Sequence, residues 1–179
     1  MSELKKIEEV KLPTIQDLHY DREVGFKQDS LNWLLNQKVP EAWVKTNSNI
    51  PYLPIDKVEY LLTKIFGTYE VMVIDYKQLA NSITVHVRLI VTNPINGERI
   101  TQDGLGAVPI QVNSGESASN LAAIKADAIK KGLPSAESYA IKDAAQKLGQ
   151  IFGGNLTRKD VIQPEPSEKI KSRWKLDTI

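Results

Sequence analysis

The sequence contains no cysteine and only two histidines, and both shortages exclude kinds of chemistry. Without cysteine there is no disulfide, thiolate metal site or cysteine nucleophile, which indicates a reducing compartment. His19 and His86 lie in segments of different character, so we expect neither a metal pair nor a catalytic triad. We expect His86 to be a polar cross-strand neighbour. The phosphate-binding pattern GxxxxGK[ST] is also absent, which argues against nucleotide hydrolysis. These features predict a protein that is not an enzyme and uses no cofactor or metal.

Long apolar runs are missing as well. The opening MSELKKIEEVKL has charges every two or three residues, so it predicts neither a signal peptide nor a membrane span. We therefore expect a cytoplasmic protein with no membrane partner. A chain of 179 residues can bury one sizeable core. We expect an N-terminal arm (1–28) that becomes ordered only against another surface, a single domain (29–160) and a C-terminal tail (161–179).

Charge is nearly balanced over the whole chain but is unevenly distributed. The net charge is +1, whereas residues 120–160 hold seven basic and four acidic side chains, a local balance of +3. A positive field on one element suits a polyanion, and the equal alternative is an ordinary solvated helix pair.

The first half of the domain alternates between helical and extended patterns. Asp29 or Ser30 can cap a short helix, SLNWLLNQKV, which should end before Pro40. The segment EAWVKTN then predicts a short strand that carries Lys45. Apolar residues at helical spacing in IDKVEYLLTKIFG predict a helix that ends at Gly67.

A two-residue rhythm follows. In SITVHVRLIVT every second residue is apolar, which is typical of a half-buried antiparallel strand. The flanking segments YEVMVIDYKQLA and ERITQDGLGAVPIQV predict two more strands, with turns at Asn81–Ser82 and in NPINGE. The result is a three-stranded antiparallel meander. The GLG at 104–106 lies inside the third strand, where it indicates a bulge or a close backbone approach.

Helical spacing returns after the meander. Leu121, Ile124 and Ala128 mark a helix up to Gly132, and Pro134 should start another. One face of the second helix and of the residues after it is mainly small and apolar: Ala140, Ile141, Ala144, Ala145, Leu148, Ile151 and Phe152. Alanines let a helix approach a neighbour closely, so we expect it to pack against the meander. The predicted fold class is α+β, with a β-β-β-α core and a long alanine-rich helix.

Several of these residues occur together in one known family. The chain resembles the Rad fifty-two superfamily of single-strand annealing proteins, and most of all its phage-encoded Sak-type branch. The resemblance covers roughly residues 38–160, with IDKVEYLLTKIFG matching the helix that precedes the family's meander. As a set the matching motifs are moderately specific. The other matching positions are Gly104, Gly106, Ala140, Ala144, Phe152, Gly153, Leu156 and the charged Arg158-Lys159-Asp160.

The resemblance implies a domain that assembles into a ring-forming homo-oligomer or a helical arc. Single-stranded DNA would lie in a basic groove around the assembly, and complementary strands would anneal without ATP during homologous recombination and DNA repair, in a bacterial host cell. Lys45 lies within about a residue of one basic position of the family, and Lys147 matches another. Gln146 stands where the family helix often has a second basic residue.

Physical reasoning adds further candidates on the same helix. A binder of single strands without sequence preference needs spaced cations and apolar faces on which bases can rest. Lys142 and Lys147, with Arg158 and Lys159 beyond the helix, can supply the cations. Tyr139 can stack a base or fill a contact with a neighbouring subunit. The alternative for each lysine is a solubilising surface charge.

The tail and the overall function each leave an alternative open. KIKSRWKLDTI places Trp174 among Lys171, Arg173 and Lys175, which suits a second DNA contact or a partner such as a single-strand-binding protein or an exonuclease. The plainer interpretation is a tail with an incidental tryptophan. For the whole protein, the alternative is a non-catalytic phage structural or protein-interaction module that does not bind DNA.

Overall fold

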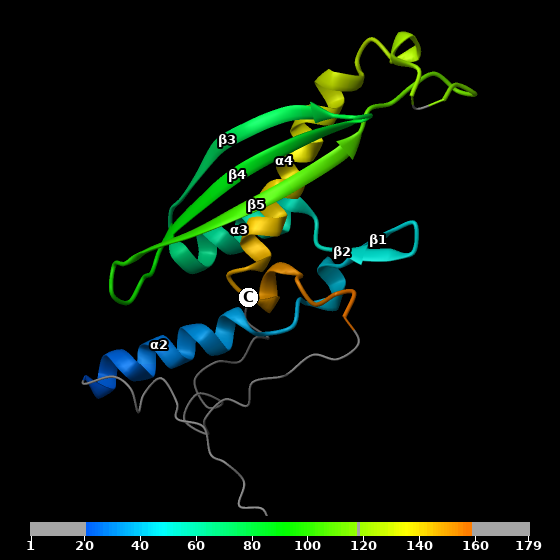
Figure 1. Ribbon diagram of the computed structural model, residues 1–179. Helices are drawn as coiled ribbons and strands as arrows, with labels where there is room; N and C mark the ends of the chain where they lie inside the picture. The colour runs from blue at the N-terminus through cyan, green and yellow to red at the C-terminus, as the bar shows by residue number, and fades with distance from the viewer. Residues whose placement is uncertain (1–20, 118, 159–179) are drawn as a thin grey trace, which may run out of the picture.

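The computed structural model describes residues 21–117 and 119–158 and has an α+β architecture (Figure 1). A sheet of three long antiparallel strands is covered on one face by helices, and a small two-stranded hairpin stands apart from it. In chain order the elements are α2 (Arg22–Leu35), the 3-10 turn η1 (Glu41–Trp43), β1 (Lys45–Asn47), β2 (Ile50–Tyr52), α3 (Ile55–Phe66), β3 (Tyr69–Leu79), β4 (Ser82–Thr92), β5 (Arg99–Pro109), η2 (Leu121–Ala123), α4 (Ala128–Gln146) and η3 (Gln150–Phe152).

The predicted meander is confirmed, with strand order β3-β4-β5. Alternate residues of the central strand β4 are buried beneath the helices: Ile83, Val85, Val87, Leu89 and Val91. The residues between them face outward. There Arg88 donates two hydrogen bonds to Asp103 on β5, at 2.7 and 2.9 Å, and His86 Nε2 lies 3.4 Å from the same carboxylate. The expected role of His86 as a polar cross-strand neighbour is therefore confirmed.

Small residues set the distance between α4 and β5. A Cβ atom at Gly104 would lie 2.0 Å from the carbonyl oxygen of Ala140, and one at Gly106 would lie 2.0 Å from that of Ala136. Both alanines are fully buried. Because backbone meets backbone here, neither glycine position has room for a methyl group. The close approach predicted for the GLG segment is confirmed, and it explains why α4 carries alanines where leucines would otherwise bury more surface.

Two predicted boundaries in the first half of the chain are wrong. The first described helix, α2, begins at Arg22, because Asp21 caps it by accepting hydrogen bonds from the backbone of Glu23 and Val24 at 2.8 and 3.3 Å. Asp29 and Ser30 lie inside this helix and do not cap it. In EAWVKTN only the last three residues form a strand, and η1 precedes them. The helix predicted from IDKVEYLLTKIFG is confirmed, and Gly67 ends it at φ 78°.

The predicted pair of helices after the meander is also wrong. A single helix, α4, begins at Ala128 and continues through Gly132 and Pro134, while the residues before it form the short turn η2. Gly132 is buried, and a Cβ there would lie 2.9 Å from Ile83 Cδ1, the end of a side chain that can move aside. Pro134 is exposed and lies inside the helix, where it removes one backbone hydrogen bond. The long alanine-rich helix itself is confirmed.

The remaining predicted segments lie mostly outside the described residues. Residues 1–20 of the expected arm belong to that part of the chain, and so do Lys159 and the whole tail from 161 onward. Within the described ranges, no helix combines the length and the apolar character needed to cross a membrane.

Candidate nucleic-acid interface

The β1–β2 hairpin brings one predicted lysine beside a tyrosine. Its two-residue turn, Ser48 and Asn49, has φ values of 48° and 63°, the positive values that tight antiparallel hairpins favour. The register pairs Lys45 with Tyr52 across the two strands. Directly opposed residues of an antiparallel pair project from the same face. Lys45 is exposed, and Tyr52 is half-buried against the body of the domain.

Lys142 on α4 joins this hairpin to the helix. Its Nζ lies 5.3 Å from the ring centroid of Tyr52 and 4.3 Å from that of Tyr139, which is 48% exposed. Cations within about 6 Å of an aromatic face are attracted by the ring's electron density. Burial lowers the pKa of Lys142 from its ordinary value. We call Lys45, Tyr52, Tyr139 and Lys142 the hairpin–helix patch.

A second aromatic group continues from the start of the hairpin. The rings of Trp43 and Tyr60 meet edge to face with centroids 5.8 Å apart, and Lys57 Nζ lies 5.6 Å from the Trp43 ring. Tyr60 is 46% exposed, and Lys57 also lies 3.4 Å from the carboxylate of Asp56. Trp43 is two residues before Lys45 in the chain. A further lysine, Lys57, is therefore held beside aromatic rings next to the segment that begins the hairpin.

Sequence reasoning missed the aromatic members of both groups except Tyr139. Tyr52 could have been found, because Asn47-Ser48-Asn49 is a turn signal that places Lys45 and Tyr52 opposite each other. Lys57 and Tyr60 are three residues apart on α3, a spacing that places them on one helix face. The contact of Trp43 with Tyr60 is tertiary and has no local signal.

Lys147 lies on a different flank of α4. Its Nζ is 3.0 Å from Asp143 Oδ2 and also donates a hydrogen bond to the backbone carbonyl of Asp103 on β5. Asp143 in turn accepts a hydrogen bond of 3.1 Å from the backbone N–H of Leu105. We call Lys147 and Asp143, with the two β5 backbone groups that they bind, the α4–β5 clip. This clip satisfies polar groups on the free edge of β5.

The remaining predicted cations are less informative. Arg158 is exposed, and its backbone N–H donates to the carbonyl of Asn155 at 3.1 Å. Lys159 lies outside the described residues. The structure thus brings together Lys45, Tyr139 and Lys142, and it places Lys147 elsewhere.

Within the described ranges, no three or more histidine, aspartate or glutamate side chains gather as a metal site would require. The best-defined acidic group, Asp103, is occupied by Arg88 and His86. The Arg88 guanidinium holds the pKa of Asp103 down to about 2, mainly through its hydrogen bonds. This arrangement ties two strands together.

The sequence matches no protein-family model, and no significant match was found among curated proteins. The resemblance to single-strand annealing proteins therefore stays a prediction based on the sequence motifs.

Proposed function

We propose that the protein binds single-stranded DNA through the hairpin–helix patch and anneals complementary strands without ATP, as a phage-encoded recombination protein. The observation that supports this most is the position of Lys142 between the rings of Tyr52 and Tyr139, with Lys45 across the hairpin. The fold supports it too, since a meander packed on a long helix is what the resemblance implies.

The chemistry of the patch matches the chemistry of a single strand. Phosphates need cations, which Lys45 and Lys142 supply, and unpaired bases need apolar faces. The Tyr139 ring is 48% exposed and can stack a base, which contributes about 1–3 kcal/mol in proteins of this kind. Neither contact reads sequence, as annealing of arbitrary strands requires. Trp43, Lys57 and Tyr60 can extend the same track toward α3.

A net charge of +1 suits a protein that acts as a repeated assembly, because each copy needs to neutralise only a few phosphates. The strand β3 supplies a surface for assembly with a second copy. Among the described residues it forms an unpaired edge of the sheet, and it exposes five large apolar side chains: Met72, Val73, Ile74, Tyr76 and Leu79. Such an edge invites association, whereas the opposite edge, β5, is engaged by the α4–β5 clip.

Light scattering tests the assembly part of this proposal. The double variant Tyr76→Lys, Leu79→Lys places two charges on β3 without touching buried residues, so it should lower the molar mass in solution while the circular dichroism spectrum stays unchanged. A matched double variant on the other edge strand, Thr101→Lys with Ala107→Lys, changes two exposed residues of β5 and should keep the wild-type mass. Equal masses for all three proteins would remove β3 from the proposal.

The test of function is the annealing of two complementary fluorescent oligonucleotides without nucleotide or metal. We expect acceleration at low salt that fades as salt rises. The double variant Lys45→Ala, Lys142→Ala should lose most of it, and the control Lys38→Ala, Lys130→Ala, with two exposed lysines elsewhere, should retain it.

Two results would count against the proposal in different ways. Equal annealing by both double variants would reject the patch. No acceleration at any salt by the folded protein would reject the annealing function and favour a protein-interaction module, for which the exposed apolar side chains of β3 are the supporting observation.

A further inference from the structure

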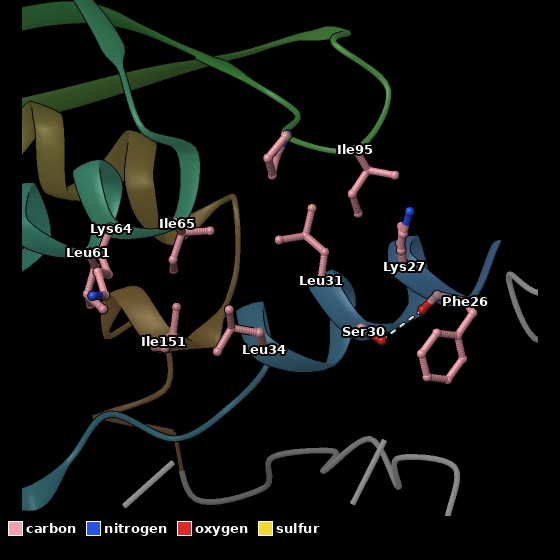
Figure 2. Close-up of a pocket in the computed structure, with 11 residues that line it drawn as sticks. Phe26, Lys27, Ser30, Leu31, Leu34, Leu61, Lys64, Ile65, Ile95 and Ile151 are labelled. Carbon is pink, nitrogen blue, oxygen red and sulfur yellow. Dashed lines mark hydrogen bonds between the residues drawn. The ribbon is translucent and has the colours of Figure 1, made fainter. Parts of the chain in front are cut away.

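An apolar groove of about 530 Å³ lies between α2 and α3 (Figure 2), and its lining includes no residue of the hairpin–helix patch. Leu31 and Leu34 line it from α2, and Leu61 and Ile65 from α3. Ile95, in the turn between β4 and β5, lines it as well. The groove is therefore built from three elements that are far apart in sequence.

The walls of the groove are fixed by contacts that do not fill it. Asn93, which is only 4% exposed, donates from Nδ2 to Gln28 Oε1 at 2.9 Å and so ties the β4–β5 turn to α2. At the other end of α2, Gly149 lies so close that a Cβ atom there would be 2.3 Å from the carbonyl oxygen of Leu35. Since α2 is held at both places, the space between it and α3 is a formed groove.

Charge selects what the groove can accept. Lys27 and Lys64 are among its lining residues, and both are exposed. Lys27 Nζ also lies 2.7 Å from Glu23, but 57% of its side chain is exposed to solvent. Apolar walls with two amines suit a segment that combines apolar anchors with acidic side chains.

We propose that this groove is the docking site for residues 1–20 of the same chain, with KIEEVKL (6–12) as the anchoring stretch. Within it Ile7 and Val10 are apolar and the acidic Glu8 and Glu9 lie between them, with Lys6 and Lys11 on the two sides, so the stretch has no net charge. Its apolar residues match the apolar walls, and its two glutamates can pair with the lysines of the groove.

Chain connectivity favours this occupant. Residue 20 is followed directly by Asp21, which caps α2, and α2 is one wall of the groove. A helix of 14 residues is about 21 Å long, whereas twenty residues can span up to about 66 Å, so the segment can reach along the whole wall. Attachment to that wall also raises the effective concentration of the segment to roughly millimolar. A separate peptide would have no such advantage.

Docking would convert the apolar groove into a covered contact. It would also join α2 to α3, whereas Asn93 and Gly149 tie α2 to the β4–β5 turn and to the segment before η3. The inference does not depend on DNA binding, because no residue of the hairpin–helix patch lines the groove.

Photocrosslinking in the full chain tests the proposal. The natural sequence has no cysteine, so Lys11→Cys provides a unique thiol for a benzophenone label within the anchoring stretch. Mass spectrometry of an equal mixture of nitrogen-14 and nitrogen-15 chains then shows whether each crosslink lies within one chain. We expect crosslinks within one chain to residues 26–34, 61–65 and 94–95.

Two sets of variants sharpen this test. The double variant Ile7→Asp, Val10→Asp replaces both apolar residues of the anchoring stretch, so it should abolish the groove crosslinks. Lys27→Glu with Lys64→Glu should at least halve their yield, because both changes oppose the acidic side chains, and the control Lys38→Glu with Lys130→Glu should not. The proposal would be overturned by crosslinks to other surfaces or by crosslinks between chains. It would also be overturned if neither set of variants changed the crosslink yield.

Discussion

Lys142 and Lys147 are five residues apart along α4 and its C-cap, yet their surroundings differ in kind. Lys142 lies over the rings of Tyr52 and Tyr139, and Lys147 binds a carboxylate and a backbone carbonyl in the α4–β5 clip. A phosphate that approaches Lys147 must compete with Asp143. A phosphate that approaches Lys142 meets a cation held by uncharged groups. Lys142 is therefore suited to bind a ligand, whereas Lys147 is suited to stabilise the packing of α4 against β5.

The largest expected effect disturbs both flanks together, because it displaces α4, the helix that carries both lysines. Gly106→Ala should lower the free energy of unfolding by about 3 kcal/mol or more, since its methyl group would meet the Ala136 carbonyl. Thermal unfolding measures this. The neighbouring Ala107→Ser, on the exposed face, should change stability by less than about 0.5 kcal/mol. A Gly106→Ala protein as stable as the wild type would contradict the close backbone contact between α4 and β5.

The next effect concerns the patch flank alone. Tyr52→Ala should weaken binding to a single-stranded oligonucleotide by about tenfold, because it removes an aromatic face and the ring that holds Lys142. Tyr52→Phe keeps the ring and should bind like the wild type. Fluorescence anisotropy with a labelled oligothymidine gives both affinities. Equally weakened binding by the two variants would show that the ring faces are not what binds.

A smaller effect is expected on the clip flank. Asp143→Ala should lower the free energy of unfolding by about 1 kcal/mol, since it leaves the Leu105 N–H and Lys147 without their carboxylate acceptor. Lys147→Met should lower it less, because the pair is half exposed. Chemical denaturation measures both. The two effects should not add in the double variant, and full additivity would argue against a shared clip.

The smallest effect is acid sensitivity at Asp103, whose carboxylate binds Arg88. Its pKa in the folded protein is lowered to about 2, against about 3.9 in an unfolded chain. The stability that it contributes is therefore present above about pH 4 and is lost as the pH falls toward 2. The difference in melting temperature between the wild type and Asp103→Asn should shrink over this range. A constant difference would exclude the ion pair as its cause.

Local pattern was enough to predict the meander, the packing of the alanine-rich helix against it and, as one of two alternatives, a close backbone approach at the GLG segment. The alternation of apolar and polar residues in β4 and the helical spacing of apolar residues in α3 can each be seen in a few consecutive residues. In the fold, the same residues form the buried face of each element. Gly132 and Pro134 led to a wrong boundary because both residues are usually found near helix ends, whereas α4 continues through them, with Gly132 buried and Pro134 exposed. The start of α2 was missed because Asp21, its cap, lies in a segment with no sustained period.

The candidate site was only partly predictable for a related reason. The sequence places Lys142 and Lys147 on or next to one helix, but it cannot show what lies beside each of them. The neighbours come from β2 on one side and β5 on the other, which only the tertiary fold determines.

The difference between the two flanks is best measured by comparing Lys142→Gln with Lys147→Gln in binding to a single-stranded oligonucleotide over a range of salt concentrations. We predict that Lys142→Gln weakens binding and reduces the slope of log affinity against log salt by about 0.7 for each phosphate that is no longer neutralised on the oligonucleotide. Lys147→Gln should leave the affinity and the slope unchanged. Weaker binding by Lys147→Gln together with wild-type binding by Lys142→Gln would contradict the assignment of the two flanks.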